Sequence, residues 1–295
     1  MASTTTTAAK TAIAAGRTGG RERAALRRSL IYIGYTIGLL LVAGPFVWMV
    51  AGAFKTAPEL HRIVPTFLPA EPTLDNFNTL FQKLNFPLYF LNSAVVAFFV
   101  VGANLLFCSM LAYALTKLHF PGRDKIFLLV MATLMVPSTV TLVPLFVLMS
   151  AIGLVNTYAG LILPFAAGPF GVFLMRQFIG SIPEDLIEAA RIDGASELRI
   201  FRSVVMPLCG TPLATLGIFT FLASWNNFLW PLVVSTSERM YTLPVGVATF
   251  SIGQHSSDYG TLMAGSVLLV APVLVVFLLL QRYFTQGIAM TGIKG

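Results

Sequence analysis

Charge is scarce in this chain of 295 residues. Asp, Glu, Lys and Arg together make up 11% of it, whereas hydrophobic residues make up 56%. Soluble domains carry roughly 25% charged residues, and the mean hydropathy here is +0.82. The composition therefore argues against a soluble helical bundle and predicts a membrane protein.

Cysteine is scarce as well, with only Cys108 and Cys209 in the whole chain. Each lies in or beside an apolar stretch, and no second metal-ligating side chain is near it in the sequence. A disulfide framework or a zinc site needs several Cys or His residues at regular spacings. We expect two buried, unreactive thiols and no metal site.

The chain contains instead six apolar runs, each long enough for the ~20 residues that a helix needs to cross a bilayer. The first run follows several arginines and is too long for the apolar core of a signal peptide, so we expect it to be retained. Residues 1–29 before it are expected to form a disordered basic tail. The expected spans are residues 30–54, 88–116, 126–150, 155–178, 207–234 and 260–282.

Ionisable residues are missing from the middle of all these runs. Ion-coupled carriers usually keep such a residue there, and membrane enzymes need a titratable or metal-binding cluster. The phosphate-binding pattern G-x-x-x-x-G-K-[ST] is missing too, since no Gly-Lys pair occurs anywhere. If a nucleotide drives this protein, another subunit binds it. A sodium site built from carbonyls and hydroxyls remains an open alternative.

The basic residues are distributed unevenly between the two sides of the expected bundle. With the N-terminus in the cytoplasm, fifteen Lys and Arg residues lie on the cytoplasmic side and four on the other side. Positive residues accumulate in cytoplasmic loops, so we expect both termini in the cytoplasm. The net charge of +7 then follows from topology, and it requires no nucleic-acid partner.

A quarter of all the charge lies in one cytoplasmic loop, at residues 183–202 (PEDLIEAARIDGASELRIFR). Residues 181–184 fit a capping box with Pro in the first turn of a helix. Gly194 is placed to end that helix in a left-handed turn, and a second helix is expected to start at Ser196. The pattern predicts a helix–turn–helix on the membrane surface.

The spacing inside this loop resembles the EAA motif of permeases in ATP-binding-cassette importers, E-A-A-x3-G-x9-I-x-L-P. Here EAA at 188–190 is followed by Gly194 and by VVMP at 204–207. The WNNFLWP stretch at 225–231 and the C-terminal residues 281–295 resemble carbohydrate permeases of the maltose type, specifically the second of their two permeases. The tail 1–29 lies outside this resemblance.

The resemblance implies an all-α, polytopic membrane protein with six transmembrane helices, the type I importer permease fold, over residues 30–295. Residues 181–207 would be its coupling loop. The implied partners are a second homologous permease, two ATPase subunits that bind ATP and magnesium, and an extracytoplasmic solute-binding protein. The chain itself would hold no cofactor, would catalyse no reaction and would lie in the inner membrane of a bacterial or archaeal cell.

The resemblance also assigns residues to three contacts. Coupling to the ATPase falls on Glu188, Ala189, Ala190, Asp193 and Gly194. A C-terminal ATPase contact falls on Gly292, Lys294 and Gly295. Contact with the binding protein falls on Gly253, Gln254 and His255.

The fifth span carries the candidate substrate-binding residues. Thr220, Ser224 and Asn227 recur at i, i+4 and i+7, and in a helix they share one face. Polar side chains in a membrane face the bundle or a wet cavity, and hydrogen bonding between helices is the alternative. Trp225 and Trp230 lie close by and would supply aromatic faces for a sugar, or anchor the helix at the interface.

Together these observations predict the permease subunit of an ATP-driven importer for a sugar or sugar-like solute. A permease for a non-sugar solute and an ion-coupled secondary transporter stay open as alternatives. The sequence does not distinguish one solute from another, nor does it divide the substrate contacts between the two permeases.

Overall fold

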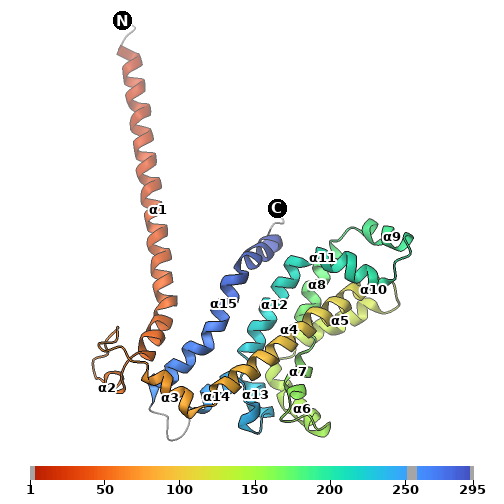
Figure 1. The fold of residues 1–295 in the computed structure, drawn as a ribbon. Coiled ribbons are helices and arrows are strands. Elements are labelled where there is room, and N and C mark those ends of the chain that lie inside the picture. The colour runs from red at the N-terminus through yellow and green to blue at the C-terminus, as the bar shows by residue number, and fades with distance from the viewer. Residues whose placement is uncertain (1–3, 251–257, 293–295) are drawn as a thin grey trace.

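The computed structural model describes residues 4–250 and 258–292, with side chains over 27–249 and 258–281, and every regular element among them is a helix (Figure 1). Three helices are continuous and long enough to cross a membrane. They are Arg27–Ala53 within α1 (Thr4–Ala53), α4 (Phe86–Lys117), and Tyr259–Gln281 within α15 (Tyr259–Gly292).

Three further spans are pairs of shorter helices that meet at a bend. α5 (Arg123–Leu134) and α6 (Ser138–Ala151) meet at 104°, and the Tyr158–Phe165 segment meets α8 (Pro169–Gly180) at 44°. The segment Glu197–Leu208 meets α12 (Gly210–Trp225) at 84°. Counting each pair as one span makes six, and the predicted all-α, six-span membrane fold is confirmed.

Proline explains where these three spans break. Pro137, Pro169 and Pro207 each lie within two residues of a bend. A proline lacks the N–H donor and its ring clashes with the preceding turn, so it ends or kinks a helix. The expected spans 126–150 and 155–178 run past Pro137 and Pro169 without a break, whereas in the structure both are interrupted.

The remaining elements are short and lie near the two ends of the bundle. They are α2 (Ala57–Leu60), α3 (Asp75–Lys83), α9 (Glu184–Ile192), α13 (Leu229–Val234), η3 (Glu238–Met240) and α14 (Leu243–Phe250). The Tyr158–Phe165 segment named above consists of α7 (Tyr158–Ile162) and η1 (Leu163–Phe165), and the Glu197–Leu208 segment consists of α10 (Glu197–Ile200), η2 (Phe201–Val205) and α11 (Met206–Leu208).

Residues 4–29 are helical, which differs from the expected disordered tail over 1–29. α1 begins at Thr4 and runs past residue 29 without a break. No proline occurs before Pro45, alanine and arginine favour helix, and extending an existing helix is easier than nucleating a new one. The first half of α1 projects away from the bundle (Figure 1).

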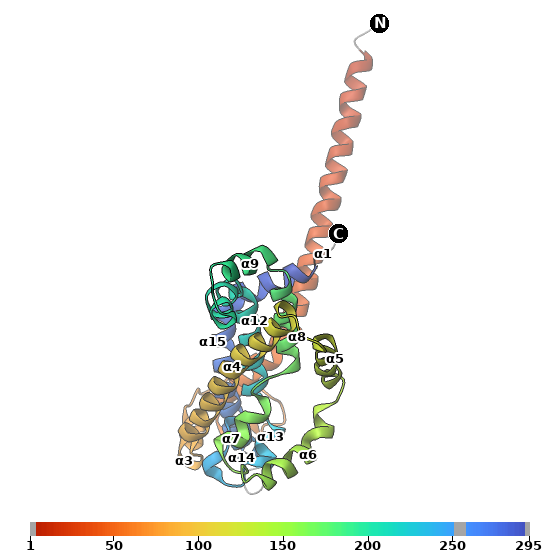
Figure 2. The same cartoon turned by 90° about the vertical axis from the view of Figure 1, so that its right-hand side faces the viewer.

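The start of α1, the end of α15 and the α9–α10 segment all lie at one end of the molecule, and α2, α3, α13 and α14 lie at the other (Figures 1 and 2). We call these the α9 end and the α14 end. α4 runs between them and packs against both α8 and α12. It contributes buried residues to all three apolar clusters, including Ala112, Val100 and Tyr89.

Candidate functional site

The loop that resembles the EAA motif folds as two short helices, α9 and α10, joined by a turn. Its capping differs from the expected capping box. Pro183 takes the N-cap position of α9 without a side-chain cap, and the Ser181 hydroxyl donates to the carbonyl of Phe178 at 2.7 Å instead. Ser181 therefore closes the preceding helix and leaves α9 to begin at the proline. Glu184 and Asp185 still occupy the first turn of α9.

Gly194 forms the predicted left-handed turn, with φ of +79°. Its N–H donates to the carbonyl of Arg191 at 3.0 Å, and the N–H of Ala195 donates to the carbonyl of Ala190 at 3.0 Å. These two bonds make a Schellman motif, which commonly ends helices at glycine. Ser196 then caps the start of α10 in extended conformation, as the sequence predicts.

The two faces of this segment differ in burial. Ile187 and Ile200 are fully buried against α4 and α8. On the other face the predicted coupling residues Glu188, Ala189, Asp193 and Gly194 are exposed, and Ala190 is half-buried. The free face also presents Ile192 at 86% exposure and Leu198 at 67%. An exposed apolar pair ringed by charge is typical of a protein-docking surface.

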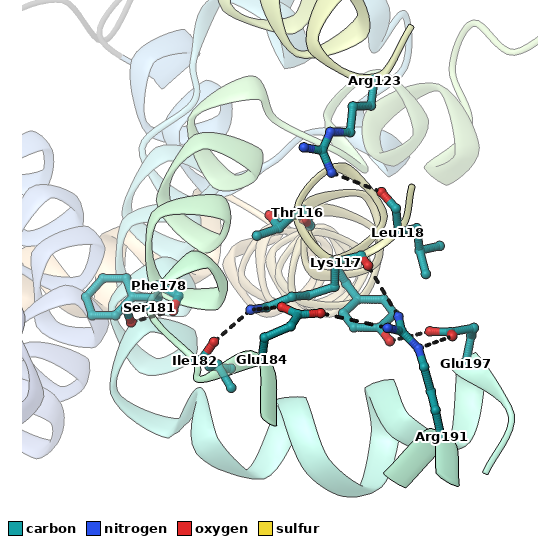
Figure 3. Close-up of polar contacts among 12 residues, drawn as sticks. Thr116, Lys117, Leu118, Arg123, Phe178, Ser181, Ile182, Glu184, Arg191 and Glu197 are labelled. Atoms are coloured by element: carbon teal, nitrogen blue, oxygen red, sulfur yellow. Dashed lines mark hydrogen bonds and ion pairs between the residues drawn. The ribbon is translucent and has the colours of Figure 1, made fainter. Parts of the chain in front are cut away.

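Lys117, at the end of α4, holds the start of α9. Its ammonium donates to the carbonyl of Ile182 at 2.7 Å and to the Glu184 carboxylate at 2.9 Å (Figure 3). The Lys117 side chain is only 4% exposed, whereas that of Glu184 is 42% exposed. A buried ammonium needs partners of this kind because its desolvation is costly.

Arg191 and Tyr113 extend this contact to α10. The Arg191 guanidinium donates to the Glu197 carboxylate at 2.9 Å and to the carbonyl of Lys117 at 3.3 Å. The Tyr113 hydroxyl donates to the same carboxylate at 2.5 Å. The bond to Glu197 raises the pKa of Arg191. We call Tyr113, Lys117, Glu184, Arg191 and Glu197 the ionic clamp; Figure 3 labels the last four of them.

A cavity of about 660 Å³ lies between α4, α6, α8 and α12. All three candidate substrate-binding residues, Thr220, Ser224 and Asn227, line it. α12 ends at Trp225, however, so only Thr220 and Ser224 share a helical face. Asn227 follows the end of the helix and lines the cavity from the turn into α13. The sequence analysis expected a single helix over 207–234, with all three residues on one face.

The polar groups of these three residues are largely uncommitted. The hydroxyls of Thr220 and Ser224 make no hydrogen bond to any described residue, and Asn227 accepts only a long bond of 3.4 Å from the N–H of Trp230. Among the described residues, the lining of the cavity contains hydroxyls, amides and aromatic rings but no charged side chain. Such a cavity can hydrogen-bond a neutral polar solute.

The two tryptophans near the cavity are buried and paired. Trp225 donates to the carbonyl of Leu269 at 3.0 Å, and Trp230 donates to the carbonyl of Gly160 at 3.0 Å. Trp230 borders the cavity, whereas Trp225 does not. Trp225 is therefore a packing residue between α12 and α15, and only Trp230 lies where a solute would pass.

Asn104 lines the same cavity, and the sequence analysis missed it. Its amide nitrogen donates to the carbonyl of Phe165 at 2.6 Å, and its amide oxygen accepts from the N–H of Gly168 at 2.9 Å. Both partners flank the break between η1 and α8, whose backbone groups lack helical partners there. The sequence does contain a signal for this residue, because Asn104 is an amide in the middle of the apolar run 88–116.

Several predicted contacts cannot be located. Gly253, Gln254 and His255 lie outside the described residues, as do Lys294 and Gly295. Gly292 is the last residue of α15. Cys108 and Cys209 are buried free thiols, as predicted.

These features define a membrane transport subunit, in which the ionic clamp joins an exposed, charged helical segment to α4, one of the helices around a cavity whose described lining is uncharged. The chain belongs to the family of binding-protein-dependent transport system inner membrane components, whose sequence profile matches residues 104–290. This membership confirms the resemblance that the EAA spacing indicated.

Known relatives match most of the chain. It is 41% identical over 269 residues to the arabinooligosaccharides transport system permease protein AraQ of Halalkalibacterium halodurans, covering 90% of this chain and 96% of that protein. It is 35% identical over 243 residues to the lactose transport system permease protein LacG of Rhizobium radiobacter, covering 82% and 88%.

A solved structure shares the fold. It is the crystal structure of a bacterial ABC transporter involved in the import of the acidic polysaccharide alginate, with a TM-score of 0.79 and 24% identity over 86% of this chain and 95% of that one. At this identity the likeness concerns the fold alone.

Proposed function

We propose that this chain is one of two permease subunits of an ATP-driven importer for a neutral sugar or oligosaccharide. The cavity carries this proposal, because its described lining offers hydroxyls, amides and an indole ring without a charged side chain. A few polar groups on an otherwise apolar wall are typical of sites for small solutes. The relatives named for arabinooligosaccharides and lactose support the assignment.

ATP is bound by another subunit and acts on this chain through the contact between the two. The exposed face of α9, with Glu188, Ala189, Ala190, Asp193 and Gly194, docks on an ATPase subunit that binds ATP and magnesium. The ionic clamp joins α9 and α10 to α4, and α4 packs against the cavity helices α8 and α12. Movement of the docked segment therefore moves the cavity wall as a rigid body, and this chain catalyses no reaction itself.

The α9 end faces the cytoplasm, and both termini lie there. The start of α1 and the end of α15 share that end with α9 (Figure 1), and the basic residues favour the same orientation. The C-terminal residues Gly292, Lys294 and Gly295 then reach the ATPase. At the opposite end the loop with Gly253, Gln254 and His255 meets the solute-binding protein, and a second permease completes the pathway.

Reconstitution tests the energy source. The complete complex in proteoliposomes, with binding protein outside and ATP inside, is expected to take up an arabinooligosaccharide or lactose. Without ATP, a proton or sodium gradient should drive no uptake. Uptake that follows the gradient and ignores ATP would make the protein a secondary transporter, and ATP-driven uptake of non-sugar solutes alone would replace the proposed substrate.

Two substitutions test the cavity. Ser224→Leu and Asn227→Leu place apolar bulk in the cavity, so uptake should fall or its KM should rise while the complex still assembles. Thr133→Leu is the matched control, because Thr133 is exposed on α5 and its hydroxyl bonds only to the carbonyl of Val130. Unaltered uptake by both cavity variants would assign the solute site to the second permease.

Labelling in sealed cells tests the orientation. Asp185 is exposed on α9 and Glu71 is exposed at the opposite end. A membrane-impermeant thiol reagent added outside should label Glu71→Cys and leave Asp185→Cys unlabelled until the cells are opened. The reverse pattern would invert the topology.

A further inference from the structure

The connection between α1 and α3, residues 54–74 with α2 inside it, is held together by two buried charged groups, Lys55 and Glu59. The Glu59 carboxylate accepts bonds from the Thr66 hydroxyl and from the N–H of Ala70 at 3.1 Å. The Lys55 ammonium donates to the carbonyl of Thr66, and the Asn76 amide donates to the carbonyl of Lys55 at 2.7 Å. These bonds join residues that lie 7 to 21 positions apart, so they fix the conformation of the loop.

That shape holds four large apolar side chains in the open. Ile63 is 100% exposed, Val64 78%, Phe67 57% and Leu68 67%. We call residues 63–68 the apolar tip. Exposed apolar patches of this kind mark surfaces that contact another protein or a membrane.

The apolar tip folds back beside the first span. The Phe67 ring lies 6.0 Å from the ring of Trp48, and Trp48 lies five residues before the end of α1, a rise of about 7.5 Å along the helix. The loop lies on the side of α1 away from α15 (Figure 1). Tryptophan is enriched at the level of lipid headgroups, so the tip reaches that level.

The backbone of the tip limits how deeply the tip can insert into a lipid bilayer. Among the described residues, no partner accepts a hydrogen bond from the backbone N–H of Ile63, Val64, Phe67 or Leu68. Unpaired N–H groups are not tolerated in hydrocarbon, but water reaches them in the headgroup region. The apolar side chains can point into the acyl chains from there, and the exposed Arg62 at the base of the tip is placed to meet lipid phosphates.

We propose that the apolar tip is a membrane-surface anchor, which inserts Ile63, Val64 and their neighbours into the lipid interface at the α14 end. The tip lies beside the face of α1 that carries Trp48, and Leu41, seven residues earlier on the same helical face, is 73% exposed. The apolar surface of the span therefore continues into the tip, which favours lipid as the occupant. A soluble partner would approach from the water. The anchor would fix the outer end of α1 laterally.

Fluorescence in liposomes tests the proposal. Ile63→Cys and, separately, Val64→Cys are labelled with an environment-sensitive nitrobenzoxadiazole dye in the full-length complex, in which the native Cys108 and Cys209 are buried. Glu71→Cys, exposed in the same loop, is the matched control. Lipids with a spin label high on the acyl chain should quench most of the emission at 63 and 64, whereas aqueous iodide should quench it at 71.

Two results would overturn the anchor. Quenching by iodide and not by lipid at 63 and 64 would place the tip in water, available to a soluble protein. Protection from both quenchers would place it under protein, which would be the second permease. Neither result depends on transport, so failure of the anchor is distinguishable from failure of the proposed function.

Discussion

The two ends of α4 are fastened to their surroundings by different chemistry. At the α9 end, Lys117 and Tyr113 meet Glu184, Arg191 and Glu197 in the ionic clamp. At the α14 end, the Asn92 amide donates to the carbonyls of Arg239 and Tyr241 at 2.9 and 2.8 Å and accepts from the Tyr158 hydroxyl at 2.5 Å. Ser93 accepts from the N–H of Leu243 at 2.8 Å. We call this second set the neutral clamp.

Burial explains the difference. Asn92 and Ser93 are 0% and 4% exposed, and charges at such positions would lose their hydration. In the ionic clamp the side chains of Glu184, Arg191 and Glu197 are 33 to 45% exposed, so water shares the cost of keeping them charged. Lys117, at 4% exposure, is the exception, and its bonds to Ile182 and Glu184 offset its desolvation. Partly exposed charged groups thus hold the segment at the α9 end of α4, whereas neutral buried side chains hold its other end.

The largest expected effect comes from breaking the neutral clamp. Asn92→Leu leaves two carbonyls and the Tyr158 hydroxyl without partners in a buried place, which should lower the unfolding free energy by about 2–4 kcal/mol. Thermal unfolding of the purified complex, followed by the reactivity of buried Cys108 and Cys209, measures it. Asn78→Leu, on the exposed face of α3, should change little. Equal melting temperatures for the two variants would contradict the neutral clamp.

Breaking the ionic clamp should cost less. Lys117→Met leaves the carbonyl of Ile182 without its hydrogen-bond donor, whereas Glu184 remains partly in water. The expected loss in the free energy of unfolding is about 1–3 kcal/mol. ATP hydrolysis by the complex should also lose part of its stimulation by binding protein, because α9 is then held less firmly to α4. Lys125→Met, at an exposed lysine in the first turn of α5, is the control. Normal coupling in Lys117→Met would show that the clamp has a structural role only.

The turn at Gly194 should give a smaller change in stability. An added side chain meets no atom within 4 Å there, but φ is +79°, so Gly194→Val is expected to cost about 1–2 kcal/mol of backbone strain. Transport should nevertheless be abolished, since the turn aims the docking face of α9. Gly102→Val, with equal space at ordinary φ on α4, should transport normally. Transport by Gly194→Val would remove the docking role of this turn.

The smallest expected effect is a pH dependence of stability that comes from Glu59. This buried carboxylate lies at the α14 end, where the neutral clamp also lies. The bond from the Thr66 hydroxyl lowers the pKa of Glu59; burial opposes this shift, and the N–H of Ala70 and the nearby Lys55 reinforce it. A lowered pKa means that this contribution to stability is complete above about pH 4.5, the usual value for Glu, and is lost as the pH falls through the lowered pKa. Glu59→Gln should flatten that part of the melting-temperature profile, and Glu71→Gln should not. If the melting temperatures of both variants changed with pH in the same way, Glu59 would not be the source of this pH dependence.

Local chemistry made part of the candidate site predictable. Gly194 and the helix start at Ser196 follow from residues within one turn of each other, and both are found in the structure. The expected capping box at Ser181 is wrong, because the hydroxyl has a nearer acceptor behind it in Phe178. The prediction that Thr220, Ser224 and Asn227 share one helical face holds for the first two residues only, because α12 ends at Trp225.

Long-range contacts account for what the sequence analysis did not find. The clamp joins Lys117 to Glu184 across 67 positions and Tyr113 to Glu197 across 84. No periodicity connects residues at such distances. Asn104 likewise meets its partners only because α8 breaks beside α4.

By itself the sequence determined that this is a six-span membrane protein with one charged, exposed helical turn, since hydropathy and the backbone preference of glycine act over a few residues. Only the tertiary structure decided which polar residues meet. The packing of α4 against α8 and α12 brings Thr220, Ser224 and Asn227 to one cavity, and it buries Lys117 under α9. Those pairings depend on where helices cross, and a crossing is a property of the packed bundle rather than of any single run of residues.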